Sequence, residues 1–512
     1  MPGKPIMYLA QSLHAIRLDP DHPTPLFRQL YEALKAAVLD GRISPGMQLP
    51  PTREFAALLG VSRQTVLNAF EQLAAEGFLS GTVGKGTFVS HNLPIADRAA
   101  NPTASPDNRH LLSERGLRYT GEQSRMNTHR GAPTAFRIGM SAVDAFPFDA
   151  WARLEARQWR RPAFQLGYND AAGFPPLREL LAAYLRASRG VNCTAEQVIV
   201  TSGSQQALYL IAHLLLAPGD AAWVEDPGYP GTRATLHAAD ARICPVPVDD
   251  QGLLVEFGAA SHPQAKLAYV TPSHQYPLGV TMSLQRRLQL LDWAADARAW
   301  IVEDEYDSEY RYSGRPLASL QSLDKTGRVI YVGTLSKVMF PGLRLGYFVV
   351  PPDLAEAFAR AKSVIDRHSA IAPQAVLADF IAEGHFARHI RRTRMICNER
   401  RVALLEALAS HLPDELHLGP ADAGLHLTAA FRSLRDDRSI VRAALEQGIE
   451  LRALSTFYAS PERSASGLLL GFAAVESSVL KSAVVALRDL LARMERESYR
   501  AETGMNQSAA SR

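Results

Sequence analysis

The sequence has few cysteines, no long apolar run and almost no net charge. Its three cysteines, Cys193, Cys244 and Cys397, are widely spaced and form no CxxC pair. This argues against a disulfide framework and a cysteine metal site, and it favours a reducing compartment. The N-terminal residues have no apolar stretch of signal-peptide length, and polar residues interrupt the apolar segment 198–216. We therefore expect a cytoplasmic protein without membrane contact and without a metal.

The near balance of charge also limits any argument for nucleic-acid binding. The formal net charge is +3, and the first 90 residues carry eight Lys or Arg against seven Asp or Glu. Neither the chain nor its N-terminal part is strongly basic, so DNA binding must be argued from where particular residues stand. With 512 residues, the chain is long enough for two or three domains.

Residues 24–90 have the pattern of a small helical domain followed by a hairpin. Apolar residues recur at helical spacing in 26–39, 52–59 and 63–76, and 78–90 reads as a β-hairpin with a glycine-rich tip. Three helices and a hairpin predict a winged helix-turn-helix. The segment resembles the GntR-type DNA-binding domain in four stretches: Leu49-Pro-Pro-Thr-Arg-Glu54, Gly60-Val-Ser-Arg-Gln-Thr-Val66, Glu76-Gly-Phe-Leu79 and Gly84-Lys-Gly-Thr-Phe-Val89.

In a winged helix, the third helix enters the major groove with its first residues at the base edges. The expected base contacts are Arg63, Gln64 and Thr65; the expected phosphate contacts are Arg53 and Ser62, with Lys85 at the wing reaching the backbone or the minor groove. Without the flanking pattern, an ordinary solvated helix face would be the better interpretation. A second basic helix, 388–401, is better explained by solvation and ion pairs than by nucleic acid.

The rest of the chain predicts a linker and a large α/β domain. Residues 91–132 lose apolar periodicity and are rich in Pro, Asn, Ser and Arg, as in a linker. From 133 to 498, apolar strands alternate with helices, which predicts a mainly parallel sheet covered on both faces and a smaller C-terminal α+β part. We expect a disordered tail from 499 to 512.

Lys337 and Asp304 suggest a cofactor. Each stands at the end of an apolar strand, where an ionised side chain is costly unless it has a covalent or charged partner. Pyridoxal phosphate requires a lysine for its Schiff base and a carboxylate for its pyridinium nitrogen. We therefore predict a pyridoxal phosphate site with Lys337 as the Schiff-base residue.

Further residues suit the remaining parts of this cofactor. The turn 201–206 joins a strand to a helix and offers backbone N–H groups to a phosphate. A phosphate would also suit the guanidinium of Arg344 and the hydroxyls of Thr334 and Ser336. Tyr306 lies on the same side of the strand as Asp304 and can reach the ring oxygen. Tyr229 is a candidate to stack on the ring, although core packing explains it equally well.

Together these motifs make residues 136–495 resemble a fold-type I aminotransferase domain, and the whole chain resembles the MocR branch of GntR-type regulators. The resemblance implies that Ser204, Gln205 and Arg344 lie near the phosphate. It also implies that Tyr168 reaches the phosphate of a partner subunit, which requires a homodimer. His274 occupies the loop where many aminotransferases have an asparagine beside the ring.

Two departures separate the chain from ordinary aminotransferases. The stretch 466–473 lacks the arginine that usually binds the substrate carboxylate, and Arg452 is a substitute only by proximity in the sequence. Leu278 replaces a small polar residue. Both weaken the case for efficient transamination of a common α-amino acid. We expect a pyridoxal phosphate-dependent regulator that binds a DNA operator and senses an amine, an amino acid or the cofactor; the alternative is an aminotransferase with an accessory DNA-binding domain.

Overall fold

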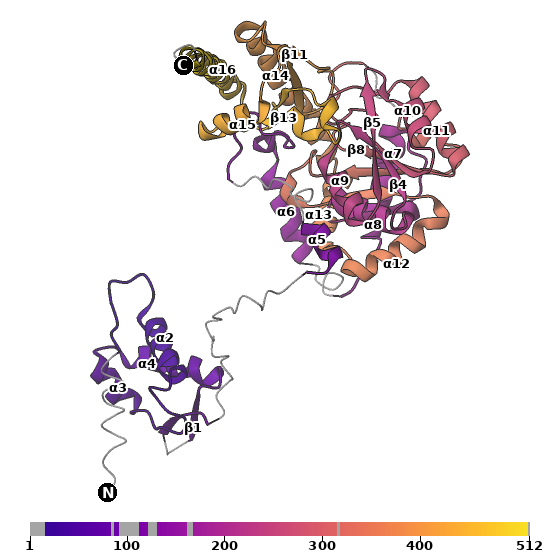
Figure 1. Ribbon diagram of the computed structural model, residues 1–512. Coiled ribbons are helices and arrows are strands. Elements are labelled where there is room, and N and C mark those ends of the chain that lie inside the picture. Colours follow the sequence, from indigo (N-terminus) through magenta and orange to yellow (C-terminus); the bar gives the residue numbers. More distant parts are fainter. Residues whose placement is uncertain are drawn as a thin grey trace. The chain divides into compact units, whose positions relative to one another are not determined.

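The computed structural model describes residues 16–82, 86–91, 112–120, 131–160, 167–314 and 318–509. It divides into two compact units, Met1–Leu111 and Leu112–Arg512, which are described separately (Figure 1). No helix in the described ranges is both long and apolar enough to cross a bilayer.

The first unit is the predicted winged helix-turn-helix. It consists of α2 (Leu26–Leu39), α3 (Thr52–Leu59), α4 (Arg63–Ala75) and the antiparallel strands β1 (Leu79–Thr82) and β2 (Gly86–Val89). The apolar faces of the helices form one core, in which the rings of Phe55 and Phe70 lie 5.7 Å apart. Helix α4 ends one residue earlier than expected. Glu76, its C-cap, instead accepts hydrogen bonds from Tyr31 and Lys35 of α2.

The second unit is built on an eight-stranded sheet. The strand order is β3-β10-β9-β8-β7-β4-β5-β6. Four neighbouring pairs are parallel, whereas β10 runs antiparallel to both of its neighbours and β6 pairs antiparallel with β5. The sheet is therefore mixed around a parallel centre. Its strands are β3 (Val198–Thr201), β4 (Ala221–Asp226), β5 (Arg242–Asp249), β6 (Gly252–Leu253), β7 (Ala265–Val270), β8 (Trp300–Glu305), β9 (Val329–Thr334) and β10 (Gly346–Val349).

Helices cover both faces of this sheet, as the continuous apolar strands predict. One face packs against α8 (Ser204–Leu215), α9 (Pro230–Ala238) and α12 (Ala355–Asp366). The other packs against α6 (Phe148–Trp159), α7 (Pro175–Arg189) and α13 (Ile371–Ala382), and α10 (Val255–Ser261) and α11 (Leu284–Ala297) lie by β4 to β8 (Figure 1). Short 3-10 turns are η2 (Val143–Ala145), η4 (Ala195–Gln197), η5 (Gln321–Leu323), η6 (Pro341–Leu343), η7 (Pro352–Leu354), η8 (Leu454–Phe457) and η9 (Pro461–Arg463).

The C-terminal part is the expected smaller α+β layer. Its sheet has the order β11-β12-β14-β13, all antiparallel. Its elements are α14 (His385–His411), β11 (Leu416–Leu418), β12 (His426–Phe431), α15 (Asp437–Glu446), β13 (Arg452–Ala453), β14 (Gly467–Gly471) and α16 (Ser477–Ala509). Residues 499–509, expected as a disordered tail, continue α16, because they include good helix formers and no proline.

One segment of the expected linker forms a helix on the second unit. Helix α5 (Glu114–Thr120) lies against α9, and Arg118 forms an ion pair with Asp240 at 3.5 Å. The remaining linker residues, 92–111 and 121–130, lie outside the described ranges.

Candidate functional site

The candidate residues gather where the parallel strands end. Tyr229 follows β4, His274 follows β7, Asp304 is the second-last residue of β8, and Lys337 comes three residues after β9. Because these strands are parallel, their carboxyl ends share one edge of the sheet, which is where ligands bind in such folds.

Asp304 is a buried carboxylate with one oxygen available. Its side chain is 5% exposed, and Oδ2 accepts a hydrogen bond of 2.6 Å from the hydroxyl of Tyr269. Oδ1 has no partner among the described residues. Burial raises the pKa of Asp304 to about 6. An unpartnered buried oxygen of this kind fits a cationic N–H donor.

Lys337 supplies an amine whose pKa is lowered. Its Nζ donates a hydrogen bond of 2.9 Å to the carbonyl of Gly139. Burial lowers the pKa of Lys337, while the charges of Asp307 and Asp304 oppose that change. A lowered pKa increases the neutral fraction of the amine, which is the form that attacks a carbonyl.

A candidate anion site lies at the start of α8. The first N–H groups of a helix have no partner within the helix, and the dipole favours negative charge there. Gly203, with φ of 99°, precedes the helix, and a Cβ at this residue would lie 3.6 Å from the guanidinium of Arg344. Ser204 opens the helix. The side-chain nitrogen of Gln205 donates instead to Gly231 and Thr235 of α9, so Gln205 offers the anion only its backbone.

Thr334 is the last residue of β9, and it pairs with Gly346, which packs against Gly203 and Ser204; Ser336 follows two residues later. Thr334 Oγ1 accepts a hydrogen bond of 3.2 Å from the backbone N–H of Ser336. This bond turns the chain sharply before Lys337. Thr334 is buried and Ser336 is half-buried. Their hydroxyls remain the donors we expect for a phosphate.

His274 and Tyr306 form a polar pair beside Asp304. The Tyr306 hydroxyl lies 2.8 Å from His274 Nδ1, and both carboxylate oxygens of Asp307 lie 3.1–3.2 Å from the same nitrogen. His274 is buried, and its Nε2 has no partner among the described residues. The Tyr306 hydroxyl and His274 Nε2 are therefore the groups of this pair that could bind the ring oxygen of the cofactor.

Tyr229 occupies a position suited to stacking. Its ring packs over Gly231, where a Cβ would come within 2.5 Å of ring atoms. Burial raises the pKa of Tyr229 to about 12, with the charge of Asp304 adding to the rise. The charges of Asp304 and Arg344 act on this phenol in opposite directions, so Tyr229 is near both candidate groups.

Tyr168 is the one candidate that stands apart. Its side chain is 85% exposed, and its ring contacts Arg367 and His368 of its own chain, at 5.4 and 6.2 Å. The described contacts do not bring it to Lys337.

Three site residues were missed in the sequence. Tyr269 reads as part of an apolar strand, yet its hydroxyl holds Asp304. Asp307 reads as a loop residue, yet it faces His274. Tyr276 lies 5.7 Å from the Tyr306 ring and 5.8 Å from Tyr229. The sequence could have pointed to these two tyrosines and this acid because each stands near the end of an apolar strand.

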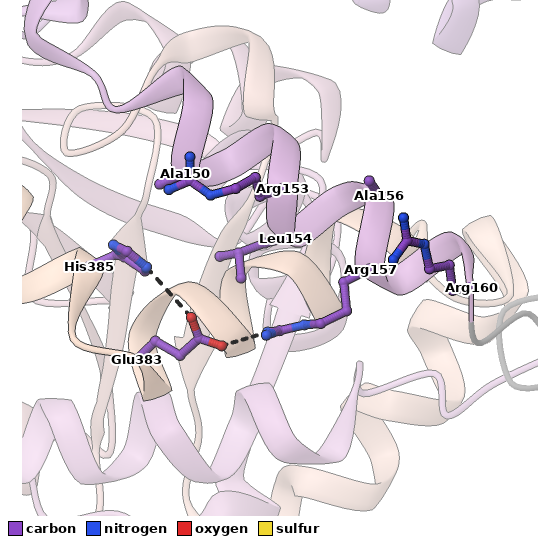
Figure 2. Close-up of a pocket in the computed structure, with 8 residues that line it drawn as sticks. All are labelled: Ala150, Arg153, Leu154, Ala156, Arg157, Arg160, Glu383 and His385. Carbon is purple, nitrogen blue, oxygen red and sulfur yellow. Dashed lines mark ion pairs between the residues drawn. The ribbon is translucent and has the colours of Figure 1, made fainter.

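A separate groove of about 420 Å³ lies between α6 and the junction of α13 and α14 (Figure 2). Arg153 and Arg157 of α6 line it, together with Arg160, the C-cap residue of that helix. Arg157 forms ion pairs of 2.6 Å with both Asp379 and Glu383. The groove shares no residue with the site around Lys337.

Two basic residues of α14, Arg400 and Arg401, have structural partners. Arg400 is buried and pairs with Asp144 at 2.5 Å, and Arg401 donates to Asn398 and to the carbonyl of Ala421. These contacts agree with the interpretation of this helix as a structural element with ion pairs.

The candidate DNA contacts lie around the start of α4 in the first unit. Arg53, Ser62, Arg63 and Gln64 are exposed, and Thr65 is half-buried. Ser62 is the N-cap of α4, because its Oγ accepts a hydrogen bond of 3.1 Å from the N–H of Thr65. Thus Ser62 also has a structural task. Lys85 lies outside the described residues.

Comparison with known families matches both units. Residues 26–89 match the family of bacterial regulatory proteins of the gntR type, and residues 140–487 match aminotransferase class I and II. The chain is 42% identical over 485 residues to the probable rhizopine catabolism regulatory protein MocR of Rhizobium meliloti, covering 93% of this chain and 96% of that one. It is 31% identical to the pyridoxine biosynthesis transcriptional regulator PdxR of Corynebacterium glutamicum, covering 93% and 98%.

Solved structures show the same fold for the second unit. The multiple substrate aminotransferase of Thermococcus profundus aligns with a TM-score of 0.67 and 27% identity, covering 75% of this chain and 98% of that one. The kynurenine aminotransferase of Pyrococcus horikoshii aligns with a TM-score of 0.65 and 29% identity, covering 70% and 90%.

The chain therefore belongs to the MocR-type GntR regulators, transcription factors that join a DNA-binding winged helix to an aminotransferase-like domain. Pyridoxal phosphate is the cofactor of that domain, and the residues present fit it: an unpartnered carboxylate oxygen on Asp304, a helix start beside Arg344, and an amine on Lys337. When bound, the cofactor supplies an aldehyde that reacts with primary amines. The full-length match to regulators favours regulation over the alternative of an aminotransferase with an accessory domain.

We expect the stability of the cofactor-free protein to fall as pH rises through the range set by Asp304. The pKa of this group is raised from 3.8 to about 6, so the unfolded chain loses the proton first and ionisation favours unfolding. Asp304→Asn removes this dependence, on the order of 3 kcal/mol between pH 4 and 7. Urea unfolding at several pH values measures it. Asp170→Asn, at an exposed partner of Arg178, is the control; parallel profiles for wild type and Asp304→Asn would contradict the assignment.

Arg63→Ala should weaken binding to a DNA fragment that the wild-type protein recognises. One bidentate base contact contributes about 1–3 kcal/mol, so we expect a loss of about 5- to 150-fold in a gel-shift titration. Arg63 is exposed and contacts Thr52 only at 3.4 Å, so the fold should persist by circular dichroism. Arg42→Ala, at the end of α2, is the control, and an unchanged affinity for Arg63→Ala would remove Arg63 from the DNA interface.

Proposed function

We propose that the second unit uses its pyridoxal phosphate site to sense a small amine, an amino acid or the cofactor itself, and that the state of this site sets binding to double-stranded operator DNA. The observation that carries the proposal is that Lys337, Asp304 and the candidate anion site occur together in a chain that also carries a winged helix. Lys337 holds the cofactor, Asp304 its ring nitrogen, and Ser204, Thr334, Ser336 and Arg344 its phosphate. We place this function in the cytoplasm.

The second part of the proposal is a homodimer. Tyr168 is 85% exposed, and two further large side chains nearby in the sequence, Phe148 and Trp159 of α6, are more than half exposed. Isolated chains seldom leave several large rings in water, and such surfaces commonly mark subunit contacts. In the proposed dimer, Tyr168 reaches the phosphate of the partner subunit. Two winged helices then face two half-sites of the operator.

The third part concerns how the site reaches the linker. Helix α8 carries the proposed anion site at its start, and Tyr209 and His213 further along it form a cluster with Tyr119 of α5. The Tyr119 hydroxyl of α5 lies 3.0 Å from His213 Nε2 and 3.2 Å from the Tyr209 hydroxyl. The rings of Tyr209 and His213 stack at 3.9 Å. A movement of α8 on ligand binding would therefore act directly on a helix of the linker.

Cofactor level is the second candidate signal. The name of one relative, PdxR, refers to pyridoxine biosynthesis, and that protein matches 93% of this chain. A regulator of this type responds to pyridoxal phosphate alone. A response that requires an added amine would instead support sensing of the amine.

We expect the purified protein to absorb visible light and to carry a borohydride-reducible cofactor on Lys337. Mass spectrometry of the reduced protein locates the label, and Lys337→Ala should lose it. Lys362→Ala is the matched control, because Lys362 is also a buried lysine but pairs with Asp366 at 3.0 Å in α12. A colourless protein that takes up no added cofactor would refute the proposal and leave the second unit a structural one.

Tyr119→Ala should uncouple the effector from DNA binding. We expect cofactor binding to persist, because Tyr119 lies outside the site, while the change in DNA affinity on effector addition is lost. Leu117→Ala, at an exposed position of the same helix, is the control. Fluorescence anisotropy of labelled operator DNA, with and without effector, measures both. An effector response equal to that of the wild type would exclude α5 as a route of transmission.

A further inference from the structure

Arg452 lies at the edge of the site on the side of the small sheet. It is the first residue of β13 and pairs directly with Leu469 of β14. Directly paired residues project from the same face of a sheet. Leu469 is fully buried and packs in one cluster with Phe457 and Tyr276. The register therefore places Arg452 beside this cluster.

The cluster adjoins the cofactor residues through Tyr276. The Tyr276 ring lies 5.7 Å from Tyr306, 5.8 Å from Tyr229 and 5.4 Å from Phe457. Burial lowers the pKa of the Arg452 guanidinium, and the neighbouring phenol of Tyr276 opposes this. The guanidinium of Arg452 thus stands next to Tyr276, whose ring contacts the candidate cofactor residues Tyr229 and Tyr306.

The segment after Arg452 is tied to the large sheet. The Phe457 carbonyl accepts hydrogen bonds from the N–H of Gly228, at 3.1 Å, and from Arg233. The N–H of Ala459 donates to Asp226 Oδ1 at 2.7 Å. Because residues 226–228 directly precede Tyr229, β13 is held in a fixed position relative to the ring-stacking residue.

Three arginines near the site therefore have different tasks. Arg344 lies beside Gly203 at the anion end. Arg233 donates to the carbonyls of Gly228, Thr456 and Phe457, so it serves the structure. Arg452 adjoins the aromatic cluster at Tyr276, whose ring lies next to those of Tyr229 and Tyr306.

We propose that Arg452 binds the carboxylate of the effector, which is therefore an amino acid and not a simple amine. The proposal rests on the proposed function, since it concerns the ligand of the same site. A guanidinium forms two parallel hydrogen bonds with a carboxylate, and partial burial strengthens them. Arg452 then supplies the positive charge that the stretch 466–473 lacks. It lies on the adjacent strand β13 and pairs with Leu469 of that stretch.

The experiment is a spectral titration of the cofactor-loaded full-length protein with matched pairs of ligands. Each pair is an amino acid and the amine left after removal of its carboxylate: leucine with 3-methylbutylamine, and phenylalanine with 2-phenylethylamine. In the wild type, the amino acids should shift the visible spectrum at lower concentrations than the amines. Arg452→Ala should weaken the amino acids about 10- to 100-fold and leave the amines within about twofold. Arg452→Lys should fall between, because it keeps the charge but not the two parallel bonds.

Two controls separate the possible failures. Arg442→Ala removes an exposed arginine of α15 and should behave as wild type. The change in operator affinity on ligand addition, measured by anisotropy, should follow the same order as the spectral shifts. If amines and amino acids act equally in the wild type, or if Arg452→Ala weakens both classes alike, the role of Arg452 is refuted while sensing at Lys337 stands. If neither class shifts the spectrum of a protein labelled at Lys337, amine sensing itself is refuted together with this inference.

Discussion

The buried carboxylate of Asp304 is the constraint on which the rest of the site depends. An ionised carboxylate in this position is unfavourable without a positive partner, and Tyr269 satisfies only one of its oxygens. The strand that holds Asp304 lies at the centre of the sheet, between two parallel neighbours, so the group cannot move to solvent. A ligand with a protonated ring nitrogen relieves this cost. The site therefore favours a ligand that brings a positive charge to Asp304.

The other candidate groups lie near this carboxylate, at the edge of the sheet where the parallel strands end. The start of α8 and Arg344 would suit an anion, Lys337 carries an amine, and Tyr276 connects the candidate site with Arg452. Helix α8 is common to the anion site and to the contact with α5. In the proposed function, α8 would take part both in binding the cofactor and in holding α5 of the linker. This suits a protein whose DNA binding responds to a ligand.

Much of this was predictable from the sequence, for identifiable reasons. The winged helix followed from the helical spacing of its apolar residues and from glycines where helices end. Asp304 and Lys337 could be chosen as candidates because ionisable residues at the ends of apolar strands are costly without a partner, and Arg344 because a guanidinium suits a phosphate. The reversed strand β10 was not, because an apolar strand carries no sign of its direction. The contacts of Gln205, which face α9, and of Asp307, which face His274, depend on side-chain packing between segments distant in the sequence.

The burial of acidic groups in the sheet also makes the stability of the folded chain depend on its cofactor. Glu225, Glu303 and Asp304 are all buried, and burial raises the pKa of each, to about 7, 8 and 6. Near neutral pH their ionisation lowers the free energy of unfolding, whereas a cofactor that binds only the folded chain raises it. Chains made when the cofactor is scarce unfold more often and are more open to proteases. The supply of cofactor then acts on the number of regulator molecules as well as on their state.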